Sequence, residues 1–130
     1  MSPLILIGRV ERGEGIATGL GCPTANLAVE HGAIIPALGV YVAETMFEGN
    51  TYPSLVCVND GRTGANLKLE VHLLNVCKDL VGRQLFVRLL EKTRDLVPWD
   101  GEDQMRTLIA ADLDCARKWF SSQKFDPVLR

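Results

Sequence analysis

The chain has 130 residues, of which 47% are hydrophobic and 23% are charged, and its formal net charge is −2. A chain of this length is the size of one domain and buries enough surface to fold without disulfides. The small net charge gives no electrostatic reason to expect nucleic acid or an anionic membrane as a partner. We therefore predict a single domain over residues 1–130, with no nucleic-acid or membrane partner.

The four cysteines are scattered, without a C-x-x-C pair or a zinc-like cluster with His. This spacing indicates reduced thiols that behave mostly as small hydrophobic residues. The start "MSPLILIG" lacks the basic region of a secretory signal. We expect a cytoplasmic protein, and a monomer.

Most of the first 98 residues read as short strands. The strand-like segments are "LILIGRVERG", "GVYVAETMF" (39–47), "TYPSLVCV" (51–58), "NLKLEVHLLNV" (66–76) and "QLFVRLLEK" (84–92). The second and third flank "EGN", a glycine-containing connection typical of a hairpin. This spacing favours an antiparallel barrel or sandwich over βαβ units, and we predict the barrel over about 4–98.

The segment 66–76 alternates strictly, with one apolar face and one face that carries Lys68, Glu70 and His72. Glu70 should therefore project away from the barrel core. A carboxylate in the middle of a strand is disfavoured unless its face meets water or a ligand. Glu70 could act as the base in phosphoryl transfer, or it could form an ion pair with Arg88 or Arg62.

The pattern changes near residue 100, where side chains recur at steps of three and four. The recurring residues are Met105, Leu108, Ile109, Asp112, Ala116, Trp119 and Phe120, with Asp112 as the polar member. Asp100 is placed to cap a helix, and Glu102 and Asp103 suit the positive end of its dipole. We predict a helix over about 101–121 that packs this stripe on the barrel, followed by an aperiodic tail over 122–130.

The stretch "GEGIATGLGCPTANL" (13–27) combines two features of a nucleotide site. Its glycines let backbone N–H groups approach a phosphate, although any loop between strands can be glycine-rich. Thr24 and Asn26 are two residues apart, so both leave the same face of an extended segment. Their neutral oxygens suit Mg²⁺ that arrives with a nucleotide's phosphates, or they bond nearby backbone in a turn.

The loop "RDLVPWDGEDQM" (94–105) carries two further candidates. Trp99 either docks on the core or stacks on a planar ligand, because an exposed tryptophan is costly. Arg94 could meet a phosphate or a carboxylate.

In this order the motifs resemble the riboflavin kinase family, from about Gly8 to Phe120. The matching pieces are "GRVERG", "GLGCPTANL", "PALGVY", "VNDG", "LEVHLLN", "KDLVG", "TRD" and the helix. "PTAN" followed at a distance by "LEVHLL" is the most specific pair. The resemblance implies a mainly β fold, a six-stranded antiparallel Greek-key barrel with one C-terminal α-helix. It also implies an ATP-dependent riboflavin kinase, which transfers a phosphoryl group from MgATP to the terminal ribityl hydroxyl of riboflavin and gives FMN and ADP.

The resemblance also implies roles for individual residues. Thr24 and Asn26 would ligate Mg²⁺, Glu70 would be the catalytic base, and Arg94 and Trp99 would line the isoalloxazine pocket. The nucleotide-binding residues would be Gly13, Gly15, Gly19, Gly21 and Asn59.

The chain departs from the family pattern in two places. Near the nucleotide side, Asp60 interrupts the usual N-I-G. On the flavin side, in the pattern R-x-E-x-x-F, Leu96 and Trp99 replace the glutamate and the phenylalanine. These departures leave two alternatives: a flavin- or nucleotide-binding module of the same fold without turnover, and a kinase for a related small-molecule alcohol. Few residues precede Gly8, so we expect no adenylyltransferase domain and no FAD synthesis by this chain.

Overall fold

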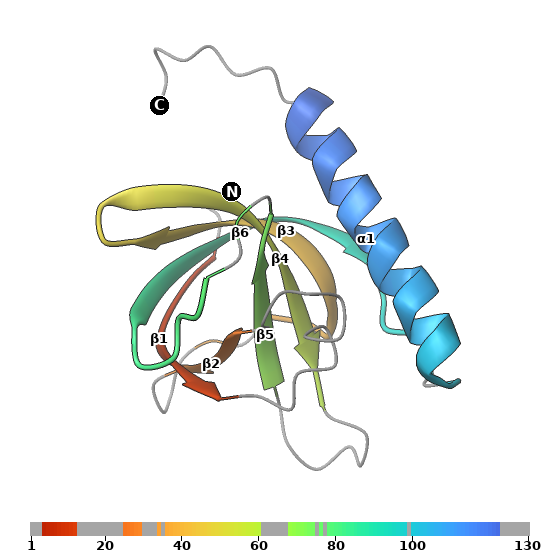
Figure 1. Ribbon diagram of the computed structural model, residues 1–130, viewed down its shortest axis with the longest axis horizontal. Helices are drawn as coiled ribbons and strands as arrows, with labels where there is room; N and C mark the ends of the chain where they lie inside the picture. Colours follow the sequence, from red (N-terminus) through yellow and green to blue (C-terminus); the bar gives the residue numbers. More distant parts are fainter. Residues whose placement is uncertain are drawn as a thin grey trace.

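The computed structural model of the chain forms a closed barrel of six antiparallel strands with one helix against its side (Figure 1). The described residues are 4–12, 25–29, 34, 36–60, 68–74, 76, 78–98 and 100–122. The elements are β1 (Ile5–Arg12), β2 (Ala25–Val29), β3 (Gly39–Phe47), β4 (Asn50–Asn59), β5 (Lys68–Leu73), β6 (Gln84–Arg94) and α1 (Glu102–Ser122). The predicted fold class is confirmed.

The order of the strands around the barrel is β1-β2-β5-β4-β3-β6, and β6 pairs with β1 to close it. The connections from β2 to β3 and from β5 to β6 therefore join strands that are not neighbours, as in a Greek key. This order places β5 between β2 and β4. It thus brings the "PTAN" strand beside the "LEVHLL" strand, although more than forty residues separate them in the sequence.

Alternate residues of every strand point into the barrel and form its core. The buried interior residues include Leu6, Val10, Leu27, Val56, Val58, Leu69, Val71, Leu85 and Val87. Gly8 permits the close approach of β1 and β2, because a Cβ at this position would lie 2.4 Å from the carbonyl oxygen of Ala28. The outer residues of the strands are consequently free to carry polar chemistry or to receive the helix.

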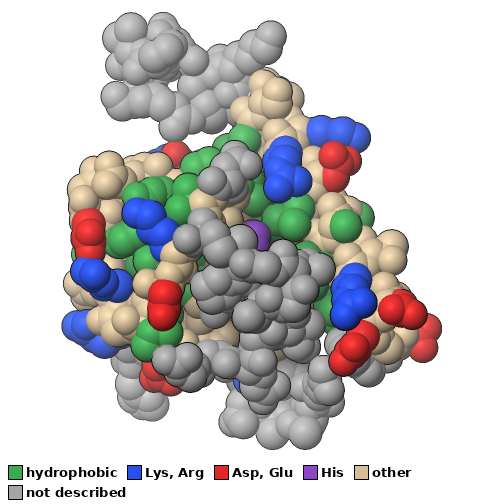
Figure 2. Space-filling model, viewed as in Figure 1, with side chains coloured by type: hydrophobic (Ala, Val, Ile, Leu, Met, Phe, Trp, Pro, Cys, Tyr) green, Lys and Arg blue, Asp and Glu red, His purple; other side chains and the backbone are tan. Residues whose placement is uncertain are grey.

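Helix α1 packs its apolar stripe on the outer face of β3 and β4. This second cluster contains Val40, Val42, Leu55, Leu74 and Ala116, with Leu113, Trp119 and Phe120 against it. Figure 2 shows hydrophobic side chains between barrel and helix, and charged side chains of both signs along the exposed surface of the helix. In the described part of the chain, no helix has both the length and the apolar character needed to cross a membrane.

Two local predictions differ from the structure. Direct reading of the sequence does not mark β2 as a strand, because its five residues offer too short a pattern beside the glycine-rich loop. The helix begins at Glu102, and the carbonyl of Gly101 accepts a hydrogen bond from the Met105 amide, so Gly101 rather than Asp100 is the N-cap. Gly101 has a φ of 93°, which favours glycine there.

Candidate functional site

The candidate site is centred on two polar residues on the outer face of neighbouring strands. Asn26 of β2 and Glu70 of β5 are paired positions in the antiparallel ladder. Directly opposite residues point to the same face, with Cβ atoms about 4.5–5.5 Å apart. Their neighbours Ala25, Leu69 and Val71 are buried in the barrel, so Asn26 and Glu70 face outward. The fold thus brings together the predicted metal ligand and the predicted base.

The amide oxygen of Asn26 is suited to a cation. Its Oδ1 atom is buried, and among the described residues it has no hydrogen-bond partner. An orphaned buried carbonyl oxygen is costly unless a ligand or water completes it. A neutral, hard oxygen is a ligand that Mg²⁺ accepts together with water and phosphate oxygens. The residue therefore fits the ion that the sequence predicts.

Glu70 is flanked on its other side by Cys57 of β4, which is its paired position in the β4–β5 ladder. Burial raises the pKa of the Cys57 thiol, and the nearby charge of Glu70 raises it further. Asn59, two residues along β4, donates a hydrogen bond from Nδ2 to Cys57 Sγ at 3.5 Å. Asn59 thus lies on the same outer face as Glu70, two residues along β4 from the position paired with Glu70.

The sequence offered Arg88 and Arg62 as ion-pair partners of Glu70. Arg88 of β6 pairs with Glu44 of β3, and Arg62 lies outside the described residues. His72, two residues after Glu70, is half-buried, and burial together with the charge of Arg117 on α1 lowers its pKa.

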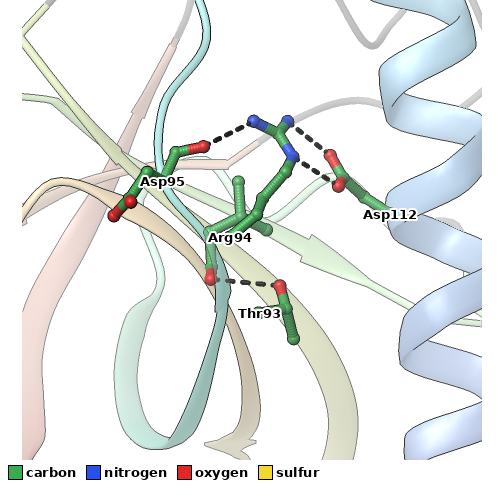
Figure 3. A network of polar contacts seen from close by, with 5 residues as sticks. Thr93, Arg94, Asp95 and Asp112 are labelled. Atoms are coloured by element: carbon green, nitrogen blue, oxygen red, sulfur yellow. Dashed lines mark hydrogen bonds and ion pairs between the residues drawn. The ribbon is translucent and has the colours of Figure 1, made fainter.

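Arg94 ends β6 and reaches toward the helix (Figure 3). Its Nε donates to Asp112 Oδ1 and its Nη2 to Asp112 Oδ2, both at 2.7 Å. Its Nη1 donates to the carbonyl oxygen of Asp95 at 3.1 Å. The hydrogen bonds to Asp112 raise the pKa of Arg94. Of the two partners that the sequence allowed for Arg94, the structure supplies a carboxylate.

Several predicted site residues lie outside the described residues. They are Gly13, Gly15, Gly19, Gly21, Thr24 and Trp99. Sequence reasoning did not identify two residues near the site. No sequence pattern points to Cys57, because its place beside Glu70 depends on the register of β4 and β5. Asp112 could have been found, because it is the single polar residue in the apolar stripe of the helix, and its partner in the structure is Arg94.

Comparison with known proteins identifies the family of the chain. The family model described as "Flavokinase: Riboflavin kinase" matches residues 1–120. The bifunctional riboflavin kinase/FMN adenylyltransferase of Escherichia coli K12 is 34% identical over 125 residues, which are 94% of this chain and 40% of that protein. The chain thus spans about 40% of the length of this curated relative.

Two solved structures with the same fold are described as different kinds of protein. A Streptococcus pneumoniae protein described as a macrolide-efflux protein is similar with a TM-score of 0.80 and 29% identity, over 90% of this chain and 39% of that one. Riboflavin kinase from Trypanosoma brucei is similar with a TM-score of 0.65 over 93% of this chain and 82% of that one. At 18% identity the latter likeness concerns the fold alone. Because the family model matches residues 1–120 and the Escherichia coli relative is 34% identical over 94% of the chain, the chain belongs to the riboflavin kinase family.

Proposed function

We propose that this chain is an ATP-dependent riboflavin kinase, which converts riboflavin and MgATP to FMN and ADP. The observation that carries the proposal is the pairing of Asn26 with Glu70 on adjacent strands, with both side chains on the outer face. Phosphoryl transfer needs a metal-bound phosphate and a proton acceptor within the span of one phosphoryl group. Membership of the family supports riboflavin as the acceptor.

In this mechanism Glu70 accepts the proton of the terminal ribityl hydroxyl as its oxygen bonds to the γ-phosphorus. The bond between that phosphorus and the β–γ bridging oxygen breaks, and ADP leaves. Asn26 and Thr24 would hold Mg²⁺, which when bound neutralises charge on the phosphate oxygens. Neutral ligands suit this role because the phosphates supply the negative charge.

The test is an assay of the purified chain with riboflavin and MgATP, in which FMN and ADP are separated by chromatography. We expect both products in equal amounts, and none when ATP or the divalent metal is omitted. Tight flavin binding without product would instead support the binding module. If another alcohol outcompetes riboflavin as the acceptor, the chain is a kinase of different specificity.

Replacing Asn26 by Ala should raise the magnesium concentration needed for half-maximal FMN formation by roughly 10–100-fold. Loss of a residue that only supports a metal ligand already lowers metal affinity by about this factor, so loss of a ligand should lower it at least as much. The buried Oδ1 atom of Asn26 is the ligand that the variant lacks. The measurement is a magnesium titration at fixed ATP, and Thr24→Ala should shift it in the same direction.

Asn50→Ala is the matched control, since Asn50 is exposed at the start of β4. Its titration should coincide with that of the unmodified protein. If Asn26→Ala also leaves the titration unchanged, Asn26 is not a metal ligand.

A further inference from the structure

A row of paired residues crosses the outer face of the barrel from the proposed base to the helix. Glu70 of β5 pairs with Cys57 of β4, Cys57 pairs with Val40 of β3, and Val40 pairs with Arg94 of β6. Neighbouring strands are about 4.8 Å apart, so the row spans roughly 15 Å. At its far end Arg94 bonds to Asp112 of α1.

Helix α1 lies over the middle of this row. Val40 and Ala116 belong to the apolar cluster between barrel and helix, and Cys57 packs against the same cluster. The helix therefore lies on the β4 side of Glu70, next to Cys57. On the β2 side of Glu70 lies Asn26.

We infer, on the basis of the proposed function, that the β2 side and the β4 side of Glu70 receive different substrates. In phosphoryl transfer the attacking and leaving oxygens lie roughly in line, on opposite sides of the transferred group. If the nucleotide phosphates are on the Asn26 side, the body of the acceptor must lie on the opposite side, along the row and next to α1. The position of the helix therefore shapes the acceptor side.

The geometry of the ion pair between Arg94 and Asp112 suits it to fix the position of α1 on the barrel. It is bidentate, and the side chains are only 26% and 12% exposed. Bidentate Arg–carboxylate contacts add geometric precision to their attraction. The other ion pair within the described part of the helix, Lys118 with Asp114, is exposed and joins residues of the same helix.

We propose that Arg94 and Asp112 are a positioning pair, which holds α1 at a fixed place beside the acceptor side of Glu70. Arg94 acts through Asp112 and does not itself contact a phosphate or the flavin. Three of its five N–H groups have partners inside the protein: Nε and Nη2 donate to the carboxylate, and Nη1 donates to a backbone carbonyl. This assigns Arg94 a different role from the substrate contact that the family resemblance implies.

The principal test is Asp112→Asn in the full chain, with steady-state kinetics for both substrates. We expect the KM for riboflavin to rise about tenfold or more, which corresponds to a loss of about 1.4 kcal/mol in binding of the acceptor. The KM for ATP should stay within about twofold, because the nucleotide lies on the other side of Glu70. Asp114→Asn is the matched control. It removes the same type of charge from the same helix, in an exposed pair of little energetic value.

A second readout follows the helix directly through two thiols of the described residues. Cys57 is half-buried against the helix–barrel cluster, whereas Cys115 of α1 is exposed. Alkylation by iodoacetamide, followed by peptide mass spectrometry, should modify Cys57 faster in Asp112→Asn than in the unmodified protein. The rate at Cys115 should not change and serves as the internal reference.

A charge-swapped variant separates positioning from direct contact. Arg94→Asp combined with Asp112→Arg restores an ion pair and should recover most of the lost affinity for riboflavin, while either change alone should not. If Arg94 contacts the acceptor, Asp112→Asn leaves the riboflavin KM unchanged and the swap fails to rescue it, which overturns the proposal.

If Asp112→Asn does not fold, Arg94→Lys takes its place. It keeps the charge but loses the bidentate geometry, so the riboflavin KM should rise in the same selective way. An unmodified chain that makes no FMN would refute the proposed function. A chain that makes FMN, but whose variants show no selective KM change and no faster labelling of Cys57, would refute the positioning pair alone.

Discussion

Glu70→Gln should lower the turnover number for FMN formation by about 10²–10⁴-fold, while binding of riboflavin persists. Gln has nearly the same shape as Glu but cannot accept the hydroxyl proton at neutral pH. Glu70 lies in the middle of β5 between the paired positions Asn26 and Cys57, so the variant keeps its surroundings. The measurements are initial rates at saturating MgATP and a riboflavin titration followed by flavin fluorescence.

The matched control is Glu91→Gln, which removes a carboxylate from an exposed position of β6. Its turnover should equal that of the unmodified chain. Turnover near the unmodified level in Glu70→Gln would remove Glu70 from the mechanism. A loss of riboflavin binding instead of turnover would make Glu70 a binding residue.

Leu85→Ala should lower the free energy of unfolding by about 2–5 kcal/mol, the range for a fully buried leucine. Leu85 is 0% exposed inside the barrel, where it belongs to the main core cluster. Truncation leaves a cavity inside the barrel. The cavity cannot close by movement of β6, because β6 is paired with a strand on each side. The melting temperature should fall by roughly 10 °C, and urea unfolding gives the free energy.

The neighbouring residue on β6 provides the control. Phe86 is larger than Leu85, but it points outward and is 40% exposed. Phe86→Ala should therefore destabilise the protein less than Leu85→Ala. The opposite order would mean that the inner and outer faces of β6 have been assigned wrongly.

Strand periodicity made much of the fold predictable. The segment 39–47 was predicted as a strand and is β3, Gly39–Phe47. The alternation in 66–76 correctly separated the inner residues of β5, such as Val71, from the outward Glu70. In both segments the alternation of side chains is a property of the strand itself, so a local pattern is enough to reveal it.

The arrangement of the candidate site depends on contacts that no local pattern contains. That Asn26 lies opposite Glu70 follows from the order and register of strands distant in the sequence. The partner of Asp112 is 18 residues away and meets it only when α1 docks beside the end of β6. Family motifs could suggest that such residues share a site, but only the folded barrel identifies which of them are neighbours.

The pairing of β1 with β6 has a consequence for biosynthesis. Ile5 of β1 is paired with Arg88 of β6, so the first strand of the barrel to be synthesised stays uncovered on one edge until the last strand of the barrel is made. Until then the nascent chain carries an open strand edge, the feature through which unfinished β proteins aggregate. Pairing of β6 with β1 is thus the step that removes this open edge from the folding chain.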